Sequence, residues 1–311
     1  MKKITISLII TLVTTSLTFG QQYGCFDFTW EGATVSGRYI PKIAMNVPVT
    51  VDSLQHEFTM QLDLGAVKTN LYGNSFQAFM DVYPSLIDKI DSTKTFMIQN
   101  EKNIMFGGMR LSMGDVEFSN MDIGLFAGYG TPMTADSVKT TTSKHIGTIA
   151  PDLFLDKVLI IDYPNNRICL SEELPSEYSN LNFQDLVMEN GRIKIPFNIN
   201  ERREMLMFDT GSSMFSLLTT KNNAKQISDG VVADSLSVNS WGTDIPVYGS
   251  KITTDVKFGG KTFPTALVYY LDNPQFDTGF KQIGIWGITG NAYFSSNTII
   301  IDYRNKKIAI K

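Results

Sequence analysis

Two apolar segments of this chain end at an aspartate. Residues 205–208 form an uninterrupted apolar run that leads into Asp209, and residues 58–62 make a similar apolar approach to Asp63. Such a run indicates a buried strand, and a carboxylate at its end loses contact with water. In both places a glycine follows the acid after one intervening residue, which permits a tight loop. The pattern predicts two buried strands that each deliver an acid to a turn.

The tripeptide that begins at Asp209 is not sufficient evidence by itself. The same three letters recur at Asp277, after Asn273 and Pro274 and without a preceding apolar run. That context predicts an ordinary turn. Position 209 differs because it has a counterpart in the other half of the chain.

The two halves of the chain repeat each other. Residues 158–168 align with residues 298–308 at a constant offset of 140, and the same offset places Gly147 on Gly287. The two acids lie 146 residues apart, so the register drifts by only six residues over nearly a hundred. We interpret this pattern as an internal duplication.

Further parts of the two halves keep the same order. Pro48 and Pro196 precede the acids by 15 and 13 residues, each within an apolar segment. Residues 111–118 and 256–263 each have a strand, a glycine turn and a strand, which predicts two β-hairpins.

The domain boundaries follow from this repeat. We expect an N-terminal β lobe over residues 21–172 and a C-terminal β lobe over residues 191–311. Residues 173–190 are polar and turn-rich and are the predicted linker, with a short helix around residues 183–188.

Residues 1–20 have the pattern of a secretory signal peptide. Lys2 and Lys3 precede a short apolar core, and Gly20 occupies a small-residue position before Gln21. The core is too short for a membrane span, so we expect export, to the periplasm or the medium, without a stable membrane span.

Composition narrows the class of protein further. The net charge is −4, and −6 (25 − 31) once the two signal lysines are removed, which disfavours nucleic-acid binding. Scattered glycines, many aromatic residues and no long amphipathic helix pattern point to an all-β chain. Cys25 and Cys169 form either one disulfide or two buried thiols.

The acid loops resemble those of the pepsin-like and retroviral-type aspartic peptidases, and the resemblance covers nearly all of the chain after residue 20. It implies a bilobal all-β fold of two duplicated β lobes, with Asp63 and Asp209 as the catalytic pair. The positions that match the family's supporting loops are Gly65, Thr210, Gly211, Ser212, Gly147 and Gly287.

The resemblance implies a monomeric endopeptidase that needs neither a cofactor nor a metal. Two carboxylates held close together share a proton, so one accepts a proton from water while the other donates one to the substrate. The substrate would be a peptide or protein bound between the lobes. His56 and His145 are too few and too isolated for a metal site.

Two positions depart from the family pattern. Family loops have a hydroxyl after the acid that bonds to the opposite lobe; Thr210 keeps it, but position 64 is Leu, and Ala66 stands where the second loop has Ser212. Leu64 motivates a second hypothesis, a catalytically impaired relative that binds peptides or a partner protein. A carbohydrate-binding or surface-binding module is a third, which leaves the paired acids unexplained.

Two other features complete the expectations. A flap hairpin is predicted over residues 95–109, with its tip at residues 99–102. Residues 106–108 are apolar and mobile enough to serve as the flap. A matching hairpin in the second half passes through Trp241. Asp162 and Asp302 are expected to stabilise turns rather than to take part in chemistry.

Overall fold

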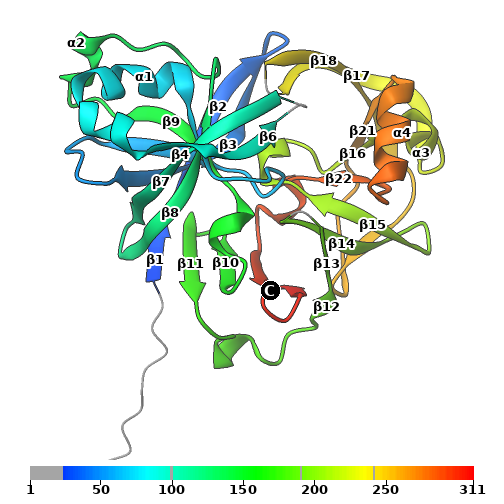
Figure 1. Ribbon diagram of the computed structural model, residues 1–311. Helices are drawn as coiled ribbons and strands as arrows, with labels where there is room; N and C mark the ends of the chain where they lie inside the picture. Colours follow the sequence, from blue (N-terminus) through cyan, green and yellow to red (C-terminus); the bar gives the residue numbers. More distant parts are fainter. Residues whose placement is uncertain (1–23, 99–100, 190, 241) are drawn as a thin grey trace, which may run out of the picture.

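The computed structural model describes residues 24–98, 101–189, 191–240 and 242–311. Strands make up 53% of the chain and helices 16%, so the chain is mostly β, as the sequence predicts. The strands form three sheets, one from each half and one shared between the halves (Figure 1). The signal-peptide prediction, residues 1–20, lies outside the described residues.

The first half of the chain forms an eight-stranded sheet. In spatial order its strands are β2 (Thr29–Val35), β3 (Arg38–Val51), β4 (Phe58–Leu62), β9 (Lys144–Ile149), β5 (Asn70–Tyr72), β8 (Val116–Phe126), β7 (Glu101–Met113) and β6 (Ile90–Ile98).

The second half forms a ten-stranded sheet. Its strands are β17 (Ser228–Ser240), β18 (Thr243–Ile252), β21 (Leu267–Leu271), β16 (Leu217–Thr220), β22 (Gly287–Thr289), β15 (Arg202–Phe208), β14 (Arg192–Ile199), β19 (Val256–Phe258) and β20 (Lys261–Thr262), with β13 (Val187–Glu189) paired to β14.

These two sheets have the same plan. The order β3-β4-β9-β5-β8-β7-β6 in the first matches β14-β15-β22-β16-β21-β18-β17 in the second. The strand directions match as well: β4 runs parallel to β9, and β15 runs parallel to β22. Both predicted glycine hairpins are present, at the β7–β8 and β19–β20 turns.

The third sheet joins the halves. Its six strands are β1 (Gly24–Asp27), β11 (Arg167–Ser171), β10 (Val158–Asp162), β23 (Thr298–Asp302), β24 (Lys307–Ile310) and β12 (Gln184–Asp185). The central pair, β10 and β23, is antiparallel with Ile160 opposite Ile300. Those two residues are equivalents under the 140-residue offset, so a local twofold axis passes between them. A disulfide joins Cys25 and Cys169 at one edge of this sheet.

Helices are short and lie at the ends of strands. The α-helices are α1 (Gly73–Val82), α2 (Ala135–Val138), α3 (Lys221–Lys225) and α4 (Pro274–Gln282), and the 3₁₀ helices are η1 (Pro84–Lys89), η2 (Pro151–Leu153), η3 (Ser176–Tyr178), η4 (Thr210–Ser212) and η5 (Ala292–Phe294). Among the described residues, none of the helices has the length and apolar composition needed to cross a membrane.

Two local predictions were wrong. Residues 183–188 do not form a helix, because β12 pairs with β24 and β13 pairs with β14; sheet pairing overrides the weak helical preference there. The second Asp-Thr-Gly, at Asp277, lies inside α4 rather than in a turn. Asn273 caps that helix by accepting from the Gln275 amide at 3.0 Å, and Pro274 occupies its first turn.

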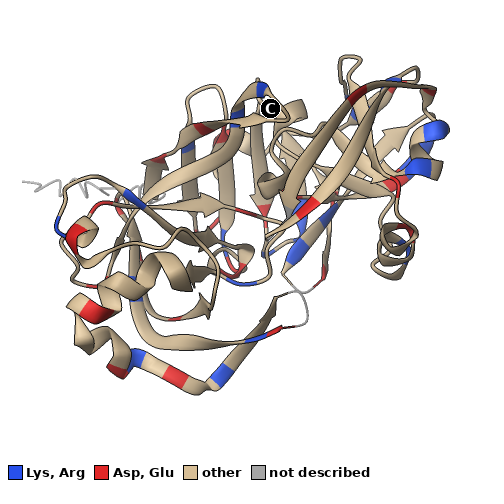
Figure 2. Ribbon diagram, turned by 90° about the horizontal axis from the view of Figure 1, so that it is seen from above, with Lys and Arg blue, Asp and Glu red and all other residues tan. Residues whose placement is uncertain are grey.

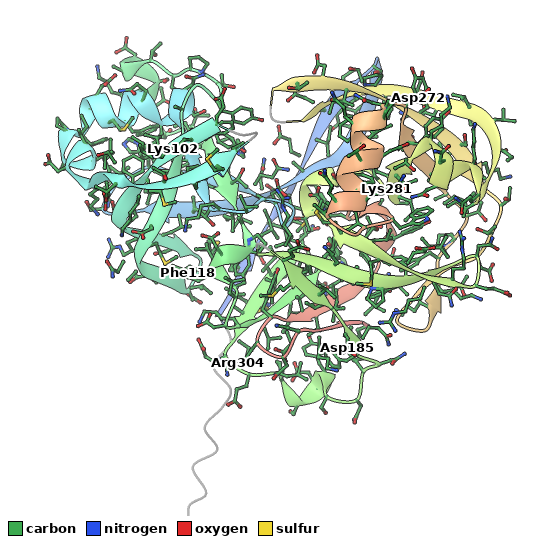
Figure 3. The ribbon with its side chains drawn as sticks, turned by 45° about the vertical axis from the view of Figure 1, so that its right-hand side comes forward. Lys102, Phe118, Asp185, Asp272, Lys281 and Arg304 are labelled. Atoms are coloured by element: carbon green, nitrogen blue, oxygen red, sulfur yellow. A yellow bond between two sulfur atoms is a disulfide. The ribbon has the colours of Figure 1, made fainter. Side chains whose placement is uncertain are left out.

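The closing turns of the two halves are structural, as expected. The Asp162 carboxylate accepts from the Asn165 side chain at 2.8 Å, and the Asp302 carboxylate accepts from the Asn305 side chain at the same distance. In Figure 3, Arg304 lies beside this shared sheet; its guanidinium donates to the Asp156 carbonyl at 2.8 Å, in the segment that precedes β10. Acidic and basic side chains are interspersed over both halves (Figure 2).

Candidate active site

The two acids follow equivalent strands. Asp63 comes directly after β4 and Asp209 directly after β15. The amide of Asp63 donates to the carbonyl of Ile149 at 2.9 Å, and the amide of Asp209 donates to the carbonyl of Thr289 at 3.0 Å. Ile149 and Thr289 end the parallel neighbours β9 and β22, so the same backbone bond fixes the start of each acid loop.

Gly147 and Gly287 let these strands pack closely. A Cβ on Gly147 would lie 2.2 Å from the carbonyl oxygen of Asn70, and one on Gly287 would lie 2.7 Å from that of Leu218. Real Cβ atoms do not approach backbone so closely, hence glycine is required at both positions. These glycines support the loops from the adjacent strand and do not contact the acids themselves.

Each carboxylate is held by the loop that follows it. Asp63 Oδ1 accepts from the amides of Gly65 and Ala66 at 2.9 and 3.1 Å. Asp209 Oδ1 accepts from the amides of Gly211 and Ser212, also at 2.9 and 3.1 Å. In addition, the Ser212 hydroxyl donates to Asp209 Oδ2 at 2.9 Å, a bond that the first loop lacks because residue 66 is Ala.

The loop glycines face each other's acids. A Cβ on Gly65 would lie 2.4 Å from Cγ of Asp209, and a Cβ on Gly211 would lie 2.7 Å from Cγ of Asp63. Each glycine therefore leaves the space that the opposite carboxyl group occupies. The structure brings the two predicted acids together between the halves.

This arrangement changes the acidity of Asp63. Burial raises the pKa of the Asp63 carboxyl well above its usual range, and the charge and hydrogen bond of Asp209 raise that pKa further. Asp63 is only 8% exposed, so its charged form loses most of its hydration. Asp63 consequently keeps its proton at a pH where an ordinary aspartate has lost it.

A hydroxyl braces the pair from one side. Thr210 Oγ1 accepts from the Leu64 amide at 2.9 Å and donates to the Leu62 carbonyl at 2.8 Å. Leu64 is fully buried in the apolar core and has no hydroxyl to form the equivalent hydrogen bonds to the second half. The cross-brace between the halves is thus half complete, as the sequence indicates.

A buried asparagine, which sequence reasoning missed, supports the second loop. Asn291 Nδ2 donates to the carbonyl of Thr210 at 3.0 Å and to the hydroxyl of Ser213 at 2.9 Å. Asn291 Oδ1 accepts from the Tyr163 hydroxyl at 2.6 Å, and Ser213 Oγ donates to the Lys42 carbonyl at 3.0 Å. Tyr163 and Lys42 belong to the first half, so this network also ties the Asp209 loop to the opposite half. The sequence carries no signal for it apart from the position of Asn291 four residues after Gly287.

A cavity of about 770 Å³ lies beside the acid loops. Gly211 and Asn239 line it from the second half, and the rest of its wall comes from β2, β3, β4, β5, β9 and the segments around α1 and α2. The residues from the first half are Glu31, Ile43, Ala44, Gln61, Tyr72, Ser75, Gly128, Tyr129, Gly130, Thr131, Met133, Ser143, Lys144 and His145.

The flap prediction is correct for the hairpin and wrong for one residue. β6 and β7 pair up to Ile98 opposite Glu101, but Gln99 and Asn100 lie outside the described residues. Phe106 is fully buried and packs on Phe76, with ring centroids 6.0 Å apart, so it belongs to the core and cannot serve as a flap. The matching β17–β18 hairpin is present. Trp241, through which this hairpin was expected to pass, lies outside the described residues.

Comparison of the sequence with models of known protein families gives no match, and comparison with curated proteins gives none either. Within the described residues, no group of three or more His, Cys, Asp or Glu side chains is placed to hold a metal ion. The two acid loops and the cavity beside them are therefore the features of the molecule that bear on its function.

Proposed function

We propose that this protein is an exported aspartic endopeptidase with the bilobal pepsin-like fold. The observation that carries the proposal is the reciprocal contact of the loops: Gly65 lies against the carboxyl group of Asp209, and Gly211 lies against that of Asp63. The matching strand order of the two large sheets supports the bilobal fold. The two carboxyl groups lie on equivalent loops, and that of Asp63 is buried. Peptide hydrolysis by two acids that share a proton needs such an arrangement.

The difference between the two loops assigns the roles. Asp63, whose pKa is raised by burial, starts as the protonated acid. Asp209 accepts three hydrogen bonds, one more than Asp63, and acts as the base. Asp209 takes a proton from a water molecule, the water oxygen bonds to the peptide carbonyl carbon, and Asp63 gives its proton to the carbonyl oxygen.

Breakdown of this intermediate completes the reaction. The proton on Asp209 passes to the amide nitrogen, the carbon–nitrogen bond breaks, and one hydroxyl of the intermediate returns its proton to Asp63. The products are a carboxylic acid and an amine, and both acids regain their starting state. The cavity beside Gly211 is where part of an extended peptide would bind.

Export is supported by two features. Residues 1–20 have the charge and apolar pattern of a signal peptide. The Cys25–Cys169 disulfide is a bond that persists in oxidising compartments and is rare in reducing ones.

The test is cleavage of a peptide library between pH 3 and 7 by the purified protein without residues 1–20. We expect cleavage that is lost in Asp63→Asn and in Asp209→Asn. Asp277→Asn is the matched control, because it changes the same tripeptide where it lies in the helix α4. Cleavage that survives in both loop variants would refute the mechanism.

Leu64 favours a second function, the binding of peptides without cleavage. Its side chain cannot form the hydroxyl bonds that Thr210 forms across the interface. If a folded wild-type protein binds a hydroxyl-bearing peptide mimic of the tetrahedral intermediate but cleaves nothing, this second function holds. Leu64→Thr should then create activity if the missing brace is the reason.

A further inference from the structure

The cavity beside Gly211 is lined by one acidic side chain, Glu31. Glu31 lies on β2 opposite Ala44 of β3, and its Oε2 accepts from the Asn46 side chain at 2.7 Å. The ion pairs between described residues do not include Glu31, and its side chain is exposed. One carboxylate oxygen therefore remains available to a ligand in the cavity.

Lys144, the one lysine on the described cavity wall, has its hydrogen bonds within its own segment. The Lys144 ammonium donates to the carbonyl and the hydroxyl of Thr140, at 2.8 and 3.1 Å, and to the carbonyl of Thr142. These three bonds use all of its hydrogens. Lys144 therefore keeps its positive charge but has no hydrogen left to donate to Glu31.

The charges of Glu31 and Lys144 each act on a neighbouring histidine. Burial lowers the pKa of His145, which lines the cavity, and the charge of Glu31 opposes this by raising it. Burial also lowers the pKa of His56, and there the charge of Lys144 adds to the effect. The charge of Glu31 thus acts on a residue of the cavity wall, and the charge of Lys144 acts on His56, which packs in the aromatic cluster of Phe58 and Phe79.

The remaining wall suits a long cationic side chain. The rings of Tyr72 and Tyr129 pack edge to face with centroids 4.7 Å apart, and Gln61 lies on the strand that leads to Asp63. Tyrosine rings attract ammonium and guanidinium groups, and amide and hydroxyl oxygens accept from them. A volume of about 770 Å³ accommodates an arginine side chain together with its backbone.

We propose that this cavity selects peptides with a basic side chain close to the scissile bond, and that Glu31 is the residue that recognises the charge. The inference rests on the proposed peptidase function, because Gly211 both lines the cavity and lies against the carboxyl group of Asp63. A charge-assisted hydrogen bond to this exposed carboxylate corresponds to a preference of up to about fivefold over a neutral side chain of the same shape.

The experiment uses peptide libraries in which one position at a time is fixed as Arg, Lys, citrulline, Leu or Glu. Citrulline keeps the shape of arginine without its charge. At one position near the cleavage site we expect kcat/KM to be about twofold to fivefold higher for Arg than for citrulline, and Glu lowest. Glu31→Gln should abolish the difference between Arg and citrulline.

A matched control and a binding assay separate the possible outcomes. Glu177→Gln changes an exposed glutamate of η3 that does not line the cavity and should keep the preference. Statine-containing peptides with Arg or citrulline at the same position report binding without turnover. Cleavage without preference for Arg overturns the inference and leaves the peptidase proposal intact. Binding that favours Arg only when Glu31 is present, without cleavage, overturns the peptidase proposal and supports Glu31 as the residue that recognises the charge. If the protein neither binds nor cleaves these peptides, both proposals are overturned.

Discussion

Removing one hydroxyl tests whether the buried asparagine network holds the Asp209 loop. Tyr163→Phe deletes the donor that lies 2.6 Å from Asn291 Oδ1 but keeps the ring, which stacks on Trp30. Tyr163 and Asn291 are 2% and 1% exposed, so water does not replace the lost donor. Leaving a buried acceptor unsatisfied costs about 1–3 kcal/mol, and we expect the free energy of unfolding to fall by that amount.

The twofold repeat provides a matched control for this change. Tyr303 is the equivalent of Tyr163 at the 140-residue offset and is 1% exposed, but its hydroxyl has no hydrogen-bond partner among the described residues. Tyr303→Phe removes the same atom from a similar environment without breaking a bond. It should leave the free energy of unfolding unchanged or raise it slightly.

The assay compares urea unfolding of the three proteins by tryptophan fluorescence and far-ultraviolet circular dichroism. Coincident transitions establish that the comparison is valid for a protein with two halves. We also expect Tyr163→Phe to lower kcat with little change in KM, because the Asp209 loop is loosened while the cavity is untouched. Equal unfolding midpoints and equal kcat values for the two variants would refute a positioning role for the network.

Three further predictions follow from the site and the shared sheet. Gly65→Ala places a methyl group about where the opposite carboxyl group lies and should abolish peptide cleavage, whereas Gly279→Ala, whose Cβ would meet nothing within 4 Å, should not; kcat/KM measures both. Asp63 has a pKa raised in the folded state, so the stability it contributes is present below the unfolded pKa and is lost as pH rises through the folded pKa. Asp63→Asn should therefore flatten the fall in melting temperature above pH 4, and an unchanged fall would contradict the raised pKa. Replacing Cys25 and Cys169 by Ser opens a link across 144 residues and should cost about 2–5 kcal/mol in a urea titration; no loss would mean that the shared sheet holds without it.

The sequence predicts those parts of the fold that are repeated. The 140-residue offset identifies residues 158–168 and 298–308 as equivalents, and their strands β10 and β23 pair at the twofold axis. A buried apolar run followed by an Asp-Tyr turn can be recognised without knowing what packs on it. The acids at 63 and 209 were also visible, since a carboxylate at the end of an apolar strand is rare. Local patterns of this kind depend on neighbours in sequence, which a chain displays directly.

The parts that the sequence hides depend on neighbours in space. Asn291 and Tyr163 are 128 residues apart, and each is unremarkable in its own segment. Residues 183–188 resemble a short helix locally, but partners on β24 and β14 draw them into strands. The burial of Phe106 likewise follows from its contact with Phe76 of α1 rather than from its glycine-rich surroundings.

The two halves share one plan, and their differences lie in the acid loops. The first loop has Leu64 and Ala66 where the second has Thr210 and Ser212, so all the hydroxyls beside the acids come from the second loop. Asp63 therefore lies in a buried, apolar loop that favours its protonated form, whereas Asp209 accepts an additional hydrogen bond from the Ser212 hydroxyl. In the proposed mechanism this asymmetry assigns the roles of acid and base, which a symmetric pair would leave unassigned. The bonds of Thr210 to the Leu64 amide and of Asn291 to Tyr163 then hold the halves together without a hydroxyl at position 64.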